Sequence, residues 1–456
     1  MIYDLIVLGG GPAGYLAAER AGHAGMNVLL VEKRSVGGVC LNEGCIPTKT
    51  LLYSAKLYDG AVNGAKYGVS ADAARLDHAK VVARKDKVVK LLVGGVKSAL
   101  KAESVTVAEG EGIVKGKAPE GFLVNAGGET HTGKRLLLAM GSVPALPPIK
   151  GLREAVESGF AVTSREALER KELPKSLCVI GGGVIGLELA SYFNSALVKV
   201  TVVEMLDHIA GENDRELVAI LQKGYEKKGV SFALGARVTE IAQNGVRYEK
   251  DGIETFLEAD TVLLSIGRRA NTQGMGLESL GVALERGAVT TDEHMRTNVE
   301  NVYAAGDVNG KSMLAHTAYR EAEVAVNHML GLPDAMRYDA IPAVLYTSPE
   351  LASVGETEAS AREKGYDAEV VSLPMRFSGR YLAENEGGDG VFKLVADRAR
   401  GVLLGAQALG SYSSEFIVAA GILIDLETPV ERIKKIVFPH PTVSEIIREA
   451  IFKLSW

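Results

Sequence analysis

The chain has 456 residues, more than one ordinary domain holds, so we expect two to four domains that each bury a core of their own. With 47% hydrophobic residues, 24% charged residues and a net charge of −6, the composition is typical of globular proteins. It excludes a disordered chain and lacks the basic surplus that nucleic-acid binding requires. No apolar stretch reaches the ~18 residues of a membrane-spanning helix, and the N-terminus lacks a signal-peptide pattern. We therefore expect a cytoplasmic protein, or a mature form already trimmed, with no membrane partner.

The first candidate nucleotide-binding unit opens the chain. Residues 4–9 form an apolar run that enters the glycine-rich turn 9–14 (GGGPAG), and a helical stretch follows at 15–25. A second apolar run at 27–31 ends at Glu32. This order of strand, turn, helix and strand is typical of the start of a dinucleotide-binding fold.

The same order recurs in the middle of the chain. An apolar run at 177–180 enters the turn 181–186 (GGGVIG), followed by a helix at 187–195 and a strand at 199–203 that ends at Glu204. The spacing from the first glycine to the acid is the same in both copies. A single turn of this kind could be an ordinary glycine-rich turn in an α/β sheet, but two matched copies predict two nucleotide sites.

Each residue type in these units has a physical role. The glycines allow a tight turn, a close approach of the pyrophosphate and close packing of helix on strand, and the helix N-terminus offers free amides. Either acid can accept hydrogen bonds from a ribose diol. Glu204 also opposes a 2′-phosphate, and residues 205–208 contain no arginine, so the second site is predicted to prefer NAD. The alternative is a solvent-exposed acid at a strand end.

Between and after these units the pattern is less regular. Residues 60–110 have helical spacing, as one long amphipathic helix or two shorter ones, and 104–140 are expected to form short strands. Prolines at 144, 147 and 148 predict a domain crossover near 143–150, and a second is expected near 265–267. A third strand at 302–305 ends in Gly306-Asp307. From residue 340 we expect a mixed sheet, and from 413 a helix-rich end.

Two of the three cysteines lie close together, at Cys40 and Cys45. In an ideal helix their Cα atoms would be ~8–9 Å apart, whereas a disulfide needs less than ~7 Å. If they are bonded, the turn is distorted, and a strained disulfide is labile, which suits redox chemistry. Two unrelated thiols or part of a metal site are the alternatives. A metal site is not expected, because the chain has no Cys/His cluster elsewhere. Cys178 lies in a strand and is expected to be a buried small hydrophobe.

These motifs together resemble the flavoprotein disulfide reductases, and among them most closely the dihydrolipoyl dehydrogenases. The resemblance covers nearly the whole chain and includes both glycine turns, the segment CLNEGCIPTK at 40–49, Gly306-Asp307, and HPTVSE at 440–445. It implies an α/β fold with two Rossmann-like dinucleotide-binding domains and a C-terminal α+β dimerisation domain. The implied division is an FAD-binding domain in two parts (1–142 and 265–338), an NAD-binding domain (143–264) and an interface domain (339–456).

The resemblance also implies a role for each matching residue. Cys40 would exchange with substrate, Cys45 would face the flavin, and His440 with Glu445 would form the acid–base dyad. Lys49 would lie near the flavin, paired with Glu188. The implied FAD contacts are Gly9, Gly11, Gly14, Glu32, Lys49, Gly112, Gly141, Ser142, Asp307, Met313, Leu314, Ala315 and His316. The implied NAD contacts are Gly181, Gly183, Gly186, Glu188, Glu204, Val238 and Gly267.

The residues alone give partial support to the dyad. Of eight histidines, only His440 lies between two prolines, which fix a loop and aim the ring. Thiol–disulfide exchange needs a base and then an acid, and a histidine neutral near pH 7 can serve as both. An ordinary loop histidine is the alternative. Val39 stands where the family usually has a threonine, so a hydroxyl contact to the cofactor phosphate is missing.

The activity that the resemblance implies is the oxidation of dihydrolipoyl groups, with electrons passing through the cysteine pair and FAD to NAD. A glutathione-reductase-like or mercuric-reductase-like enzyme and a flavin redox sensor without turnover remain alternatives. The implied assembly is a homodimer in which His440 of one subunit faces the cysteines of the other. The implied partner is a lipoylated carrier protein or domain of a 2-oxoacid dehydrogenase, acetoin or glycine-cleavage complex. Because no lipoyl-carrying domain precedes Met1, we expect that carrier to be a separate protein.

Overall fold

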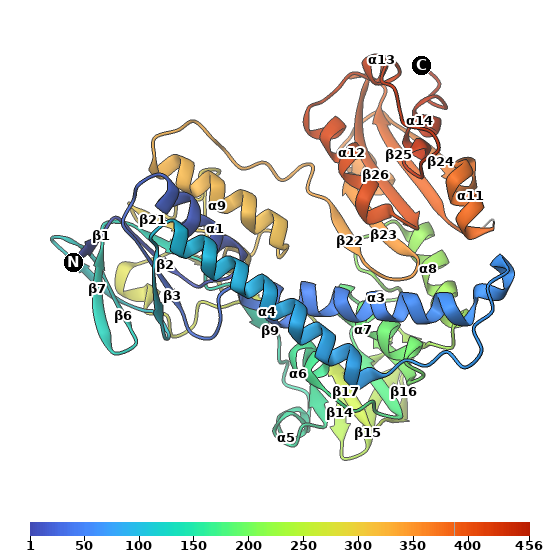
Figure 1. The fold of residues 1–456 in the computed structure, drawn as a ribbon, viewed down its shortest axis with the longest axis horizontal. Coiled ribbons are helices and arrows are strands. Elements are labelled where there is room, and N and C mark those ends of the chain that lie inside the picture. The colour runs from blue at the N-terminus through green and yellow to red at the C-terminus, as the bar shows by residue number, and fades with distance from the viewer. Residues whose placement is uncertain (387) are drawn as a thin grey trace. The chain divides into compact units, whose positions relative to one another are not determined.

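The computed structural model describes residues 1–386 and 388–456, which form two compact units (Figure 1). Unit 1 comprises Met1–Thr50, Ala79–Pro147 and Gly267–Arg337. Unit 2 comprises Leu51–His78, Pro148–Ile266 and Tyr338–Trp456. Among the described residues, no helix combines the length and the apolarity that crossing a bilayer requires.

Unit 1 is built on a five-stranded parallel sheet. The strand order is β21 (Val302–Ala304), β8 (Leu136–Leu138), β2 (Leu5–Leu8), β3 (Val28–Glu32) and β4 (Thr106–Glu109). All residues of β2 and β8 are buried, as expected for strands covered on both faces. The helices α1 (Pro12–His23) and α9 (Ala315–Met329) lie together in this unit (Figure 1).

Unit 2 contains a second parallel sheet of the same design. Its order is β10 (Ala161–Val162), β17 (Thr261–Leu264), β11 (Ser176–Ile180), β12 (Lys199–Glu204) and β13 (Ser231–Leu234). In each sheet the strand that enters a glycine turn is central, and the strand that ends in the acid is its neighbour. The fold class predicted from the sequence, with two Rossmann-like domains, is confirmed.

A third five-stranded sheet lies in the C-terminal part of unit 2. Its order is β22 (Ala343–Leu345), β23 (Glu350–Gly355), β26 (Val402–Gly410), β25 (Val391–Asp397) and β24 (Ala368–Pro374). The sheet is antiparallel throughout, so the expected mixed sheet is wrong, because every neighbouring pair of strands runs in opposite directions. The expected helices follow as α12 (Ser413–Asp425), α13 (Val430–Ile433) and α14 (Glu445–Ile451). They pack on the sheet through a buried core that includes Phe392, Phe416 and Ile447.

The remaining elements complete the two units. Residues 60–110 contain the end of α3 (Cys45–Val62), the 3₁₀ helix η1 (Gly64–Tyr67) and one long α-helix, α4 (His78–Ala102). The label η denotes a 3₁₀ helix throughout. The first helix begins at Pro12 rather than at 15, because proline suits a first helical position. The other helices are α2 (Gly38–Glu43), α5 (Leu152–Glu157), α6 (Ser164–Glu169), α7 (Val184–Ser195), α8 (Arg215–Lys227), η2 (Leu277–Leu280), η3 (Asp307–Asn309), α10 (Glu358–Glu363), η4 (Met375–Phe377) and α11 (Gly379–Asn385). The other strands are β1 (Ile2–Tyr3), β5 (Ile113–Ala118), β6 (Gly121–Ala126), β7 (Glu129–Gly133), β9 (Ser142–Pro144), β14 (Arg237–Ala242), β15 (Gly245–Lys250), β16 (Ile253–Glu258), β18 (Arg268–Ala270), β19 (Leu284–Glu285) and β20 (Ala288–Val289).

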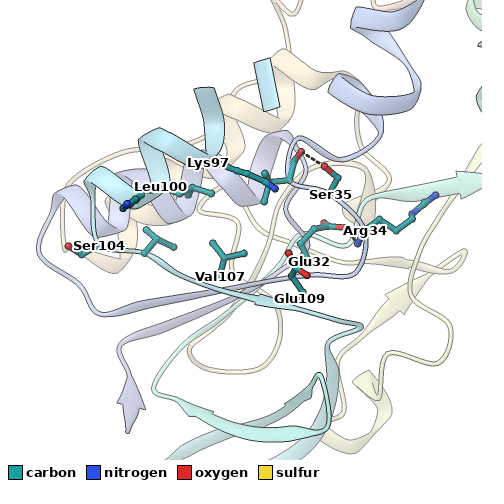
Figure 2. A pocket seen from close by; sticks show the side chains of 11 residues that line it. Glu32, Arg34, Ser35, Lys97, Leu100, Ser104, Val107 and Glu109 are labelled. Atoms are coloured by element: carbon teal, nitrogen blue, oxygen red, sulfur yellow. Dashed lines mark hydrogen bonds between the residues drawn. The ribbon is translucent and has the colours of Figure 1, made fainter. Parts of the chain in front are cut away.

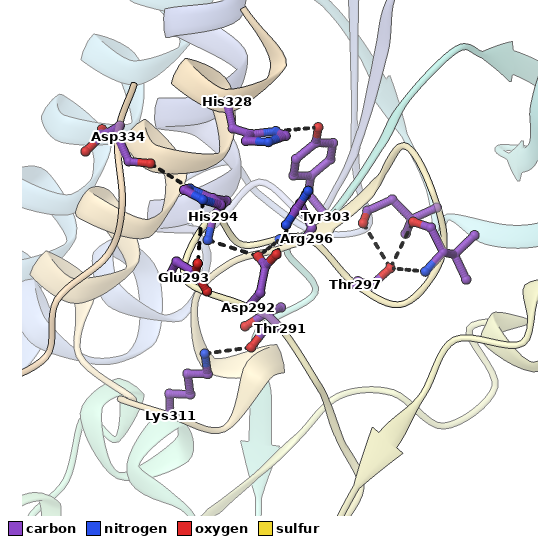
Figure 3. Close-up of polar contacts among 12 residues, drawn as sticks. Thr291, Asp292, Glu293, His294, Arg296, Thr297, Tyr303, Lys311, His328 and Asp334 are labelled. Atoms are coloured by element: carbon purple, nitrogen blue, oxygen red, sulfur yellow. Dashed lines mark hydrogen bonds and ion pairs between the residues drawn. The ribbon is translucent and has the colours of Figure 1, made fainter. Parts of the chain in front are cut away.

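A polar network fastens the C-terminal end of α9 to the loop before β21 (Figure 3). Asp292 accepts the backbone N–H groups of His294 and Arg296, both at 2.9 Å, and the Arg296 Nε at 2.6 Å. The imidazole rings of His294 and His328 stack with centroids 5.2 Å apart, and the Tyr303 hydroxyl lies 3.0 Å from His328 Nδ1. Burial, and then the neighbouring Arg296 and His294, lower the pKa of His328. The network therefore holds α9 through the uncharged imidazole of His328. The other end of α9 begins at the predicted flavin segment 313–316.

A buried ion pair joins the start of α8 to the antiparallel sheet within unit 2. Lys393, on β25, places Nζ 2.9 Å from Asp214 and 2.7 Å from Glu216. Asp214 caps α8 by accepting the backbone N–H groups of Glu216 and Leu217. The side chains of Lys393 and Asp214 are only 9% and 8% exposed. Removing the lysine would therefore leave a capping carboxylate buried without its cation.

Lys393→Met is expected to destabilise the protein by about 3–5 kcal/mol, because it leaves a buried carboxylate unpaired. Urea denaturation followed by circular dichroism measures the change. The matched control is Lys227→Met, because Lys227 pairs with Asp389 at 3.2 Å in a contact whose side chains are 72% and 73% exposed. That control should cost under about 1 kcal/mol. Equal effects of the two substitutions would contradict the role assigned to the buried pair.

Candidate active site

Each glycine turn is held by the acid that follows it. One carboxylate oxygen accepts the amide of the turn's second residue, and the other accepts the amide two residues beyond the acid. The two bonds of Glu32 come from Gly10 at 2.7 Å and Arg34 at 2.8 Å, and those of Glu204 come from Gly182 at 2.6 Å and Leu206 at 2.8 Å. Because a carboxylate has about four acceptor sites, each acid can still accept a hydrogen bond from a ribose hydroxyl.

The space around each glycine shows whether glycine is required there by the packing of the chain or by the approach of a ligand. A Cβ on the first or third glycine of the pattern GxGxxG would clash with the chain. At Gly9, a first glycine, it would lie 2.2 Å from the Ala139 carbonyl oxygen. At Gly186, a third glycine, it would lie 2.3 Å from the Gly181 oxygen. The second glycines, Gly11 and Gly183, are different. Their Cβ would meet nothing closer than 3.9 Å and nothing within 4 Å, respectively. Packing does not require glycine at these two positions, whereas a closely approaching pyrophosphate does.

The helices behind both turns are also prepared for an anion. Gly11 and Gly183 are the N-cap residues of α1 and α7, and neither helix start has a side-chain cap. A helix start with open amides favours a phosphate group. The residues present therefore fit two dinucleotides, one in each unit.

A pocket of about 410 Å³ opens beside the first acid (Figure 2). It lies between the end of β3, the loop after it, and α4. Three cations line it, Arg34, Lys97 and Lys101, together with the carboxylates of Glu32 and Glu109. Its charge suits an anionic ligand that also contacts Glu32.

Asp307 is held in place by buried neighbours in unit 1. The Ser142 hydroxyl donates to Asp307 Oδ2 at 2.5 Å, and Arg268 donates to both the hydroxyl and the carbonyl oxygen of Ser142, at 2.7 and 2.8 Å. The fully buried Glu321 accepts the N–H of Gly306 at 2.6 Å. The sequence analysis did not identify Arg268 or Glu321, because neither belongs to a motif that it used.

The two cysteines lie on either side of a helix break. The helix α2 ends before Gly44, whose φ and ψ of −144° and −103° are not helical, and α3 begins at Cys45. Both cysteines are half-buried thiols, and the side chain of Cys40 is hydrogen-bonded to Cys45. This bond, followed by burial, raises the pKa of Cys40, while the nearby Lys49 opposes the rise. The contact with Cys45 and burial therefore both disfavour a thiolate at Cys40.

The histidine–glutamate pair is formed in unit 2. His440 Nδ1 lies 2.9 Å from Glu445 Oε1, and the Thr442 amide donates to Glu445 Oε2 at 2.9 Å. The Thr442 bond, and then the His440 bond, hold the pKa of Glu445 below its usual value. Because a carboxylate only accepts, Nδ1 carries the proton and Nε2 of the neutral ring is left to act as the base. The His440 side chain is 76% exposed.

The other predicted site residues divide between the units. The predicted FAD contacts all lie in unit 1, where Met313 and His316 are exposed and Gly112 packs close to Leu8 and Val31. The predicted NAD contacts lie in unit 2 except Gly267, which begins the last segment of unit 1. Glu188 is buried and accepts the Tyr346 amide at 2.9 Å. Its pairing with Lys49 stays a prediction, as do the cofactor roles of all these residues.

The loop after Glu204 contains an arginine contact that the sequence analysis missed. Arg215, the first residue of α8, donates to both oxygens of Asp207 at 2.9 and 3.1 Å, and His208 Nδ1 lies 2.6 Å from the same carboxylate. The prediction of NAD preference rested on residues 205–208 alone. In the structure Arg215 is paired with Asp207.

Comparison with known proteins identifies the family. Residues 3–322 match the pyridine nucleotide-disulphide oxidoreductases, and residues 341–451 match the dimerisation domain of the same group. The chain belongs to the pyridine nucleotide-disulphide oxidoreductases. It is therefore an FAD-dependent oxidoreductase that uses FAD and NAD, and the resemblance to flavoprotein disulfide reductases is confirmed.

Named relatives include both lipoyl enzymes and other reductases. The chain is 38% identical to a dihydrolipoyl dehydrogenase of Geobacillus stearothermophilus, over 98% of this chain and 95% of the relative. Among solved structures it is similar to LpdA of Mycobacterium tuberculosis, with a TM-score of 0.89, 26% identity and 99% of each chain covered. It is also similar to the HOCl-induced flavoprotein disulfide reductase RclA of Escherichia coli, with a TM-score of 0.86 and 28% identity. That match covers 99% of this chain and 100% of RclA.

The parent protein is expected to favour NAD⁺ over NADP⁺ by about tenfold or more in kcat/KM, which corresponds to about 1.4 kcal/mol. Asp207→Asn should raise kcat/KM for NADP⁺ about threefold or more by releasing Arg215, with the NAD⁺ value nearly unchanged. The double variant Asp207→Asn/Arg215→Ala should lose that gain. An unchanged NADP⁺ value in Asp207→Asn would mean that Arg215 does not reach the phosphate.

Proposed function

We propose that the protein is a dihydrolipoyl dehydrogenase, which oxidises protein-bound dihydrolipoyl groups and passes the electrons to NAD. The observation that carries this proposal is the thiol pair, in which Cys40 and Cys45 lie on either side of the break at Gly44 and their side chains meet. The 38% identity to dihydrolipoyl dehydrogenases over 98% of the chain supports the choice of substrate.

The chemistry of the chain's own residues is a thiol–disulfide exchange. A substrate thiolate attacks the Cys40 sulfur of the oxidised pair, and the Cys45 sulfur leaves as a thiolate. The second substrate thiolate then attacks the substrate sulfur bonded to Cys40, which closes the lipoyl disulfide and releases the Cys40 sulfur. His440 Nε2 accepts the proton of the first substrate thiol, while Glu445 holds the ring and stabilises its charged form. The proton of the second substrate thiol passes to the Cys40 sulfur as it leaves. FAD and NAD supply the electron-carrying chemistry that re-oxidises the pair.

The cofactor assignments follow the two glycine turns. We assign FAD to unit 1, supported by the open face of Gly11, the pocket beside Glu32 and the fixed carboxylate of Asp307. We assign NAD to the turn of unit 2, supported by the open face of Gly183 and by the acids Glu204 and Asp207. The predicted four-part division into domains and the cytoplasmic location are part of this proposal.

A homodimer is supported by the matched dimerisation domain and by an exposed apolar stripe. On α12, Val418 and Ile422 are 51% and 53% exposed, and Leu426 just beyond the helix is 68% exposed. Their spacing of four residues places them on one helix face, and exposed apolar faces mark association sites. We infer that this face pairs two copies and that His440 of one subunit serves the cysteines of the other. The lipoyl groups would come from a carrier protein of a 2-oxoacid dehydrogenase, acetoin or glycine-cleavage complex.

Substrate choice tests the proposal against other disulfide reductases. The purified flavoprotein should form NADH, followed at 340 nm, with dihydrolipoamide and NAD⁺, but not with reduced glutathione. Cys45→Ser should abolish this reaction while retaining bound FAD. Turnover with glutathione alone would refute the substrate assignment, and the absence of turnover with any thiol would favour a redox sensor.

Mixing two inactive variants tests the shared site. Cys40→Ser and His440→Gln proteins, unfolded and refolded together in equal amounts, should recover roughly a quarter of the parent activity on a symmetric-dimer model. About half of the dimers are then mixed, and each mixed dimer has one intact site out of two. Each variant refolded alone is the control. No recovery, with mixed dimers confirmed by mass, would place the whole site within one subunit.

A further inference from the structure

The loop after each acid returns to the glycine turn and holds it a second time. In unit 2 the amide of Gly182 donates to Glu204, and the Gly182 carbonyl oxygen accepts the amide of Ala210 at 2.8 Å. In unit 1 the Gly10 carbonyl oxygen accepts the amide of Gly37 at 2.7 Å. The second residue of each turn is therefore fixed at both its amide and its carbonyl group.

The residue that makes this second bond differs between the two units. Gly37 has a φ of 97° and Ala210 has a φ of 60°, so both lie in the left-handed region. Glycine adopts that region without steric cost, whereas the Cβ of an alanine crowds the backbone there. Ala210 is also buried. An alanine keeps such a conformation only where its surroundings hold it.

Asn213 supplies that support within unit 2. Its Nδ2 donates to the carbonyl oxygen of Ala210 at 2.7 Å, so Ala210 is bonded on both sides of its strained φ. Asn213 Oδ1 accepts the hydroxyl of Ser353, on β23, at 3.3 Å. The next residue, Asp214, forms the buried ion pair with Lys393 on β25. The end of the loop is therefore fastened to the antiparallel sheet at two adjacent residues.

We propose that Asn213 is a positioning residue for NAD, and that it acts through Ala210 on the glycine turn. A peptide group is planar and trans, so its N–H points away from its C=O. The bond from Ala210 to the Gly182 oxygen therefore also sets the direction of the Gly183 N–H, at the start of α7. The proposal rests on the assignment of NAD to the turn of unit 2.

Without Asn213, the steric cost at Ala210 favours a relaxed loop in which the Ala210 amide leaves Gly182. The Gly183 amide then loses its fixed direction towards the pyrophosphate. Because NAD binds the parent conformation of the turn, its apparent affinity falls with the fraction of molecules that keep this conformation.

The test measures NAD⁺ binding to the oxidised, FAD-bound protein by isothermal titration calorimetry, so it needs no thiol substrate. Asn213→Ala should raise the Kd for NAD⁺ by about threefold to tenfold, as expected for one lost hydrogen bond. Bound FAD and circular dichroism show that the variant is folded. An unchanged Kd in Asn213→Ala would overturn the proposal.

A second pair of variants tests whether Asn213 acts through Ala210. In an Ala210→Gly background, Asn213→Ala should change the Kd by less than about twofold, because glycine keeps a positive φ without support. An effect of the same size in both backgrounds would mean that Asn213 does not act by holding the strained alanine, and would overturn the proposal.

Asn385→Ala is the matched control. Asn385 makes the same pair of bonds elsewhere in unit 2: Nδ2 donates to the Tyr381 carbonyl oxygen, and Oδ1 accepts the Ser411 hydroxyl, both at 2.9 Å. Its substitution should leave the Kd for NAD⁺ unchanged. A rise equal to that in Asn213→Ala would show a general loss of stability and would contradict the proposal.

Gly183→Ala separates this inference from the NAD assignment on which it rests. A Cβ there would meet nothing in the chain within 4 Å, so only a ligand at the turn would oppose it. If Gly183→Ala weakens NAD⁺ binding and Asn213→Ala does not, the assignment stands and the role of Asn213 is wrong. If Gly183→Ala leaves the Kd unchanged, NAD does not bind at this turn, and the assignment and the inference both fail.

Discussion

The bond between an acid and its own glycine turn is the constraint on which both parallel sheets depend. A strand that ends in a carboxylate can fix the turn of the neighbouring strand only when the two strands are adjacent and in register. Glu32 and Glu204 satisfy this condition through Gly10 and Gly182. Each bond sets the position of a helix start and of its open amides. The fold and the preparation of the anion site are therefore one structural feature, present twice.

The chemistry of the thiols depends on a second local constraint, the interruption of the helix at Gly44. On one continuous helix, Cys40 and Cys45 would point to different sides and could not share a proton. The break lets the two side chains meet, and the charge that one sulfur carries then decides the protonation of the other. Lys49, less than two turns into α3, is placed to offset part of that charge.

The sequence predicted features that depend on near neighbours and missed those that depend on distant ones. The glycine turns, their acids and the cysteine spacing are short motifs, and each followed from steric or covalent limits. The antiparallel order of the third sheet depends in part on the pairing of β23 with β26, which lies far along the chain, and the apolar runs alone are compatible with either direction. The role of Lys393 was not predicted, because a lysine within a strand is expected to be exposed. Its burial is understood only when its partner Asp214, at the start of α8, is known.

The same limit applied within the candidate site. Arg268 and Glu321 contact residues outside their own segments, namely Ser142 and Gly306. No motif joins them, and a sequence without its fold shows only an arginine and a glutamate in otherwise ordinary segments. His440 was an exception, because its acceptor Glu445 is only five residues away.

The two nucleotide units share a turn but differ in the charge around it, and the proposed assignment of a different ligand to each unit rests on this difference. In unit 1 the acid stands beside a pocket with three cations, and the half-buried Arg268 lies near Asp307. In unit 2 a second carboxylate, Asp207, follows the acid and occupies the nearby Arg215. A ligand with an extra phosphate meets repulsion there, whereas a ribose with two free hydroxyls meets acceptors. In the proposed assignment, the shared turn provides the pyrophosphate site, and the residues around it determine which dinucleotide binds.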